Sequence, residues 1–215
     1  MGPTWYRFVI RGYLHRKSKN TDTPIAGRAV FIDYWRYKEK GYNPNTTHRI
    51  TVDEIKDCAI KHGIRFQYGD ILVFRSGFID TYNNLSTSER ERLASLKSKE
   101  CTFVGLEQSE EMLDFLHDSY FSAVVSDTPA FEAWPPQGRG LHTHALALWG
   151  LPIGELWDLE KVSEVCKAKQ QYSFFLTSSP TNLPGVYLLQ YLVYTQALTV
   201  FAGAIGSPPN AQAIF

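Results

Sequence analysis

The feature that most constrains the fold of this chain is an alternation of short apolar runs with helical patterns. The apolar runs are of strand length and are rich in β-branched and aromatic residues. They cover residues 29–32, 71–74, 122–126 and 172–177, and the helical patterns cover residues 51–62, 86–99, 110–117 and 159–169. This alternation predicts one α/β domain with a mixed or parallel sheet, and it leaves the order of the strands open.

Polar and aromatic side chains stand where these apolar runs end. Asp33 and Trp35 come after the first run, Arg75 after the second and Asp127 after the third. Because the carboxyl ends of strands face the ligand crevice in open α/β sheets, we predict that these four residues bind substrate. Trp134, in the Pro-rich loop 131–139, is a fifth candidate. The alternatives are a loop cap for Asp33 and a structural ion pair for Arg75.

The residues best suited to catalysis or metal binding lie in the stretch LHTHALALWGLPIGELWD, residues 141–158. His142 and His144 precede Glu155 there, with an apolar helical segment and a Pro-Gly bend between them. Imidazole and carboxylate groups bind metals and exchange protons near neutral pH, so these three residues are the predicted catalytic candidates. In the alternative interpretation, the histidines are surface or satisfied core residues at a helix start and Glu155 opens the next helix.

Charge and cysteine content exclude several classes of partner. Lys+Arg 22 balance Asp+Glu 22, so we expect no binding to nucleic acid or to a membrane surface. Three widely spaced cysteines predict a reducing compartment, and the absence of a secretory pattern predicts a cytoplasmic protein. We expect a small-molecule substrate and a homo-oligomer.

Several stretches together resemble the Putative cyclase family, the metal-dependent hydrolases that include bacterial-type kynurenine formamidase, and in particular a divergent fungal branch. The stretches are GRAVFIDYWRY (27–37), GDILVFRSGF (69–78), AVVSDTPAFEAWPP (123–136), LHTHALALWGLPIGELWDLEKV (141–162), FFLTSSPTNLPG (174–185) and IGSPPNAQAIF (205–215). Their order and spacing carry the resemblance.

The resemblance implies a swivelling β/α/β fold with a mixed sheet and a metal-dependent hydrolase. Such an enzyme opens an amide, ester or lactone of a small aromatic or secondary-metabolite compound with zinc or manganese, as an arylformamidase of tryptophan catabolism does. Glu155 takes the place of the family's metal-binding glutamate. His142 is the nearest candidate for the metal-binding histidine and His144 the second, while Thr143 occupies the usual histidine position.

The chain departs from the family pattern in two places. No HxGTHxD segment or HxxxH pair lies ahead of residue 140, which predicts a chain truncated at its N-terminus. We expect residues 1–24 to be a non-matching arm and residues 25–215 to be one domain. Residues 186–203, VYLLQYLVYTQALTVFAG, are an expected insertion, which is either a translated intron or a packed helix, with a membrane helix disfavoured.

Two further functions stay open on the sequence alone. The chain is either a metal-free cyclase or isomerase, in which an aromatic pocket orients the substrate, or an inactive truncated family member that serves as a binding module. Turnover without bound metal would distinguish the metal-free enzyme from the hydrolase, and absence of turnover would indicate the inactive family member.

Overall fold

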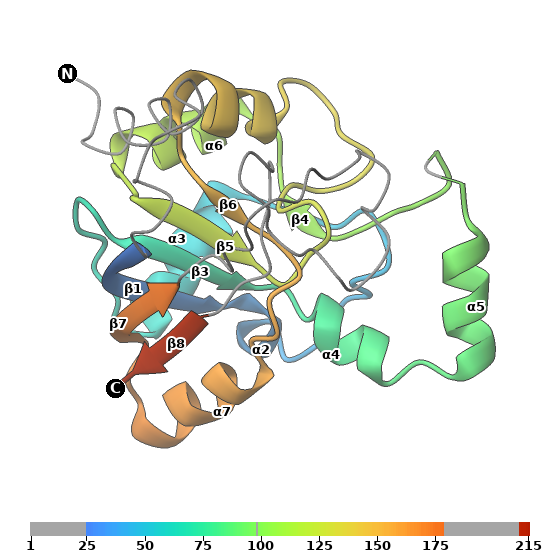
Figure 1. The fold of residues 1–215 in the computed structure, drawn as a ribbon, viewed down its shortest axis with the longest axis horizontal. Coiled ribbons are helices and arrows are strands. Elements are labelled where there is room, and N and C mark those ends of the chain that lie inside the picture. The colour runs from blue at the N-terminus through green and yellow to red at the C-terminus, as the bar shows by residue number, and fades with distance from the viewer. Residues whose placement is uncertain (1–24, 98, 179–210) are drawn as a thin grey trace, which may run out of the picture.

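A six-stranded mixed sheet is the centre of the molecule in the computed structural model, which describes residues 25–97, 99–178 and 211–215 (Figure 1). The strand order is β6-β5-β3-β1-β7-β8. The strands are β1 (Ile25–Asp33), β3 (Ile71–Arg75), β5 (Ala123–Ser126), β6 (Ile153–Gly154), β7 (Ser173–Ser178) and β8 (Ala211–Ile214). The predicted α/β class with a mixed sheet is confirmed.

Strand direction divides the sheet into two parts. Strands β6, β5, β3 and β1 are parallel neighbours, whereas β7 runs antiparallel to both β1 and β8. In the parallel part, β3 and β5 are completely buried, and β1 is buried from Ala29 to Asp33. This burial explains why these runs read as continuous apolar sequence instead of alternating with polar residues.

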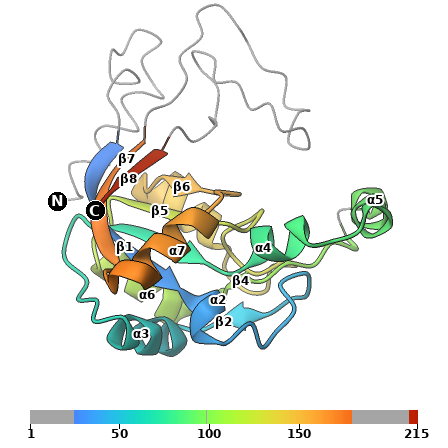
Figure 2. The same cartoon turned by 90° about the horizontal axis from the view of Figure 1, so that it is seen from below.

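The helices connect the strands and cover the sheet. Their bounds are α2 (Tyr34–Tyr37), α3 (Val52–Lys61), α4 (Phe78–Asn83), α5 (Thr87–Ser95), α6 (Glu110–Asp118), the π-helix η2 (Thr143–Trp149) and α7 (Glu160–Lys169). A small second sheet pairs β2 (Arg49–Ile50) with β4 (Gly105–Leu106). Helices α3 and α6 contact each other on one side of the main sheet (Figure 2).

Local sequence explains where the two main covering helices begin and what they bury. Thr51 and Glu54 form a capping box at the start of α3, in which each side chain accepts the backbone N–H of the other residue. Ser109 caps α6 in a similar way by accepting the N–H of Met112. The buried faces of α3 and α6 join the core on the sheet.

Helix α5 is the counterexample, because it buries no residue and stands apart from the sheet (Figure 1). Its mixed-charge sequence predicts a solvated helix, and the structure confirms that prediction. Among the described helices, none is both long and apolar enough to cross a membrane.

The structure at Gly77 and at Glu155 differs from the sequence expectations. Helix α4 was not expected. Gly77 at its start has a φ of 84°, and the ring of Trp35 leaves no space for a Cβ there. Glu155 follows the short strand β6, so it does not open a helix. The expected arm at 1–24 and the expected insertion at 186–203 lie outside the described residues.

Candidate functional site

The parallel strands bring the predicted polar residues to one edge of the sheet. Since β1, β3, β5 and β6 run in the same direction, their carboxyl ends meet at this edge. Asp33 and Arg75 end their strands, while Asp127 and Glu155 follow directly after theirs. The structure therefore confirms the shared location, but it divides these residues among three separate hydrogen-bonded groups.

The first group is centred on the imidazole ring of His142, which lies between two carboxylates. Its Nδ1 is 2.6 Å from Oε1 of Glu132, and its Nε2 is 3.1 Å from Oε1 of Glu155. The side chains of His142 and Glu155 are 36% and 35% exposed, whereas that of Glu132 is 5% exposed. One carboxylate thus holds the ring from inside the protein, and the other meets it at the surface.

Backbone contacts hold the three members of this cluster in place. Glu132 lies in the loop after β5 and accepts the N–H of Leu141 and that of His142, at the point where the helical segment leading into η2 begins. Gly150 ends η2 with a φ of 65°, and the chain then returns through β6 to Glu155. Glu132 therefore binds both the ring of His142 and the backbone that carries it.

The carboxylates of Glu132 and Glu155 shift the pKa of the His142 ring. Hydrogen bonds to Glu132 and then to Glu155 raise the pKa of His142 to about 9, although burial opposes this shift. Burial alone would raise the pKa of Glu132, but the hydrogen bonds from His142 and from two backbone N–H groups bring it below its ordinary value. In these surroundings the ring is cationic near neutral pH, and both of its N–H groups donate.

His144, the second histidine candidate, does not join this cluster. Its Nδ1 is 3.0 Å from the carbonyl oxygen of Gly140, and its ring lies 5.8 Å from that of Trp149. The structure therefore brings His142 together with Glu155 and leaves His144 outside the cluster.

The second group is a buried ion-pair network around Arg75. Its guanidinium donates to Asp33 at 2.8 Å and to both carboxylate oxygens of Glu160, at 2.9 and 2.6 Å. Asp33 also caps α2 through the N–H of Arg36 and accepts the hydroxyl of Ser163. Both alternatives weighed from the sequence, a cap for Asp33 and an ion pair for Arg75, are present in the structure.

The third group is a turn bound by the Asp127 carboxylate, which accepts the N–H and the hydroxyl of Ser76 and the N–H of Gly77. Burial raises the pKa of Asp127 to about 6, and these donors act in the opposite direction.

Trp35 packs near this turn and donates its indole N–H to Asp80 at 2.8 Å. Trp134 is half-buried and pairs through its backbone with Phe103. A role in binding substrate stays a prediction for these residues.

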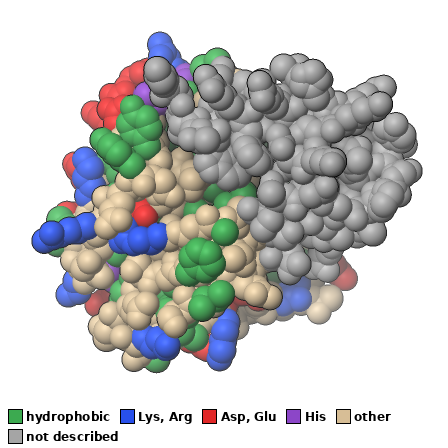
Figure 3. All heavy atoms as spheres, turned by 60° about the vertical axis from the view of Figure 1, so that its left-hand side comes forward, with side chains coloured by type: hydrophobic (Ala, Val, Ile, Leu, Met, Phe, Trp, Pro, Cys, Tyr) green, Lys and Arg blue, Asp and Glu red, His purple; other side chains and the backbone are tan. Residues whose placement is uncertain are grey.

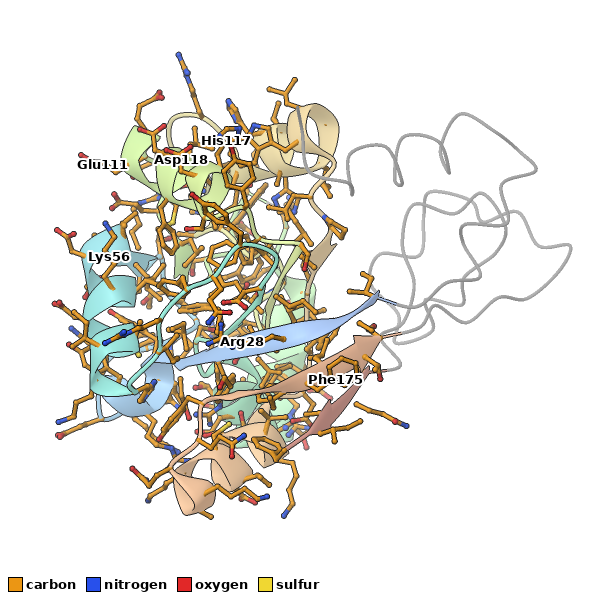
Figure 4. The ribbon with its side chains drawn as sticks, turned by 90° about the vertical axis from the view of Figure 1, so that its left-hand side faces the viewer. Arg28, Lys56, Glu111, His117, Asp118 and Phe175 are labelled. Carbon is orange, nitrogen blue, oxygen red and sulfur yellow. The ribbon has the colours of Figure 1, made fainter. Side chains whose placement is uncertain are left out.

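A cleft of about 640 Å³ lies elsewhere, between the start of α3 and α6. Acidic side chains around α6 form a patch on this part of the surface (Figure 3). Lys56 on α3, and Glu111 and Asp118 on α6, lie at its rim (Figure 4). None of the predicted site residues lines this cleft, and its open, acid-rich wall offers no paired acid and base. We therefore place the candidate site at the His142 cluster.

A metal centre needs more ligands than this cluster provides. The 3.1 Å between His142 Nε2 and Glu155 Oε1 suits two ligands of one ion, with bonds of about 2.1 Å. A catalytic zinc needs three protein ligands, however, and the described residues contain no group of three His, Cys, Asp or Glu side chains placed to hold a metal ion. The described residues therefore do not form a metal site by themselves.

Glu132 is the site residue that sequence reasoning missed. It lies in the Pro-rich loop 131–139, in which only Trp134 was a candidate. The available signal was an acidic residue between apolar neighbours shortly after a strand end, since such a residue is buried only with a partner.

Comparisons with known proteins agree with this architecture. The sequence profile described as Putative cyclase matches residues 11–133. A crystal structure described as a novel cyclase is similar with a TM-score of 0.69 and 26% identity over 91% of this chain. Isatin hydrolase A from Ralstonia solanacearum is similar in fold, with a TM-score of 0.51 and 14% identity over 76% of this chain. The present chain spans 56% of the length of each of these structures. No curated protein matches it.

Proposed function

Because this chain belongs to the Putative cyclase family, we propose that it is a hydrolase of an amide, ester or lactone bond in a small aromatic or secondary-metabolite compound. Glu132, His142 and Glu155 are its acid–base centre. The observation that carries this proposal is the pair of short contacts that join both ring nitrogens of His142 to carboxylates, at 2.6 and 3.1 Å, on a side chain that stays 36% exposed.

The division of burial assigns different tasks to the two carboxylates. Glu132 is almost completely covered, so it cannot reach a substrate and instead orients the ring through Nδ1. Glu155 is 35% exposed and is available to take a proton from a water molecule. His142 Nε2 contacts Glu155, and because its side chain is 36% exposed, its proton can pass to a leaving group.

A hydrolytic cycle follows from these roles. Glu155 accepts a proton as a water oxygen attacks the substrate carbonyl carbon. The carbon–nitrogen or carbon–oxygen bond breaks, and His142 gives its Nε2 proton to the leaving atom. The proton on Glu155 then returns to Nε2, which restores the starting state. The carboxylate of Glu132 stabilises the charged ring throughout.

The substrate class is narrowed by the sequence resemblance to kynurenine formamidase. An N-aryl formamide is therefore the first compound to test, and a role in tryptophan catabolism of a fungal cell is the corresponding biological proposal. Zinc or manganese, the ions that the resemblance implies, would be held by His142 and Glu155. No catalytic step above depends on such an ion.

A substrate panel tests the proposal. Purified protein is assayed with formanilide, phenyl acetate and an aromatic lactone, in parallel with elemental analysis and with a chelator. We expect release of formate from formanilide or opening of one of the other two bonds. A protein that isomerises an aromatic substrate without incorporating oxygen from water would instead be the metal-free cyclase, and no turnover with any bond would favour a binding module.

A further inference from the structure

Leu156, the residue next to Glu155, has a backbone conformation that its side chain disfavours. Its φ is 56°, in the left-handed region, and its side chain is 50% exposed. For residues other than glycine, asparagine and aspartate this region is strained, because the Cβ approaches the backbone oxygen. Folding alone would be served better by glycine or asparagine at such an exposed position.

The surrounding backbone fixes this conformation. The N–H of Leu156 donates to the carbonyl oxygen of Thr128, and the next N–H, that of Trp157, donates to Ser126. These bonds hold the segment across the carboxyl end of β5, directly after the residue that contacts His142. Strain that persists under such constraint is concentrated at functional sites.

Some of the exposed large apolar side chains follow His142 or Glu155 closely in the chain. Leu146 and Leu148 lie on η2, which begins directly after His142, and they are 45% and 56% exposed. Leu156 is the corresponding exposed side chain on the Glu155 segment. The other exposed large apolar side chains of the described residues lie on different segments, such as Phe175 on β7 (Figure 4). An acid–base pair bordered by apolar groups suits a substrate with an apolar body and one polar reacting bond.

We propose that Leu156 is a specificity-determining residue that contacts the aromatic ring of the substrate whose scissile bond lies at His142 and Glu155. This inference rests on the proposed hydrolase function and adds the residue that selects aryl over small aliphatic substrates. The leucine side chain is then retained for binding despite its backbone strain.

The test separates binding from folding with the variant Leu156→Asn, since asparagine tolerates a positive φ. Gln170→Asn is the matched control, because Gln170 also has a positive φ of 52° and is exposed at the end of α7. Kinetic constants are measured on formanilide and on formamide, which share the formyl–nitrogen bond and differ in the ring. Thermal midpoints are measured for all three proteins.

We expect Leu156→Asn to melt at the wild-type temperature or about 2 °C higher. Its KM for formanilide should rise about tenfold, the loss expected when part of a buried leucine contact is removed, with kcat within about twofold. Its activity on formamide should stay unchanged, and Gln170→Asn should keep both activities. An unchanged KM for formanilide, or an equal loss on both substrates, would overturn the proposal while leaving the hydrolase function intact.

If the wild-type protein hydrolyses no compound of the panel, the function proposed above fails, and binding then decides the role of Leu156. Calorimetric titration with formanilide should show binding to the wild-type protein and about tenfold weaker binding to Leu156→Asn. Absence of binding to the wild-type protein, or equal binding to both, would overturn the role of Leu156 as well.

Discussion

Two charged groups at the same edge of the sheet are built from similar residues and differ in their access to solvent. In the Arg75 network, Asp33 and Arg75 are 0% and 3% exposed, and the guanidinium is held from two sides by Asp33 and Glu160. In the His142 cluster, the ring is also held by two carboxylates, but His142 and Glu155 remain about one-third exposed. The first arrangement encloses the Asp33–Arg75 pair and leaves only Glu160 29% exposed, whereas the second leaves a titratable pair within reach of a ligand.

The contrast shows that polar residues at strand ends serve two purposes in this fold. Asp33 and Arg75 are directly opposite each other in the register of β1 and β3, so their pair fastens the ends of two central strands. His142 and Glu155 connect a helix start to the loop after an edge strand, where less of the core depends on them. We therefore expect substitutions to affect stability in the first group and activity in the second.

The largest effect on stability should come from Arg75→Met. Removing the guanidinium leaves the carboxylate of Asp33 buried without its strongest partner, which should lower the free energy of unfolding by about 3–5 kcal/mol. Urea denaturation measures this loss. Lys161→Met is the control, because the Lys161–Glu164 pair is exposed and should contribute less than about 1 kcal/mol. Similar small losses for both variants would remove the distinction between the buried network and a surface pair.

A smaller effect is expected from pH, and it belongs to the His142 cluster. The pKa of His142 in the folded protein is raised to about 9, above its ordinary value near 6.5. The folded state therefore binds the extra proton, and the stabilisation is fully present below pH 6.5 and lost as pH rises through about 9. Solvent screening of this partly exposed side chain keeps the effect modest.

Thermal midpoints of the metal-free wild-type protein and of His142→Gln, recorded from pH 6 to pH 10, check this expectation. The advantage of the wild-type protein should shrink as the pH rises. A difference between the two proteins that does not change with pH would show that the ring is not held as a cation by Glu132 and Glu155.

Much of the fold was predicted from local patterns. The helical pattern over residues 51–62 identified α3, and the apolar runs identified β1, β3, β5 and β7, because both signals lie within a few neighbouring residues. The family and the α/β class also followed from the sequence. Helix α4 was missed because it begins at Gly77 without a side-chain cap, and the packing of Trp35 against Gly77 joins segments that are distant in sequence.

The site was predicted only in part, because its contacts join distant segments. His142 and Glu155 were candidates by residue type, but their meeting depends on the bend after η2 and on the short strand β6. Glu132 was not identified, since its partners lie nine and ten residues further along the chain. The pairing of Asp33 with Arg75 depends on strand register, which no pattern within either strand specifies.

The central claim is that His142, clamped by Glu132 and Glu155, performs the acid–base chemistry of a hydrolase. Its most direct test is kcat/KM for formanilide, or for whichever substrate the panel identifies, in His142→Gln compared with His144→Gln. His144 lies two residues away and bonds to the carbonyl oxygen of Gly140, so it controls for local disturbance. We predict a loss of about 10²–10⁴-fold for His142→Gln and less than about threefold for His144→Gln, with both variants folded. Equal activity in the two variants would contradict the account.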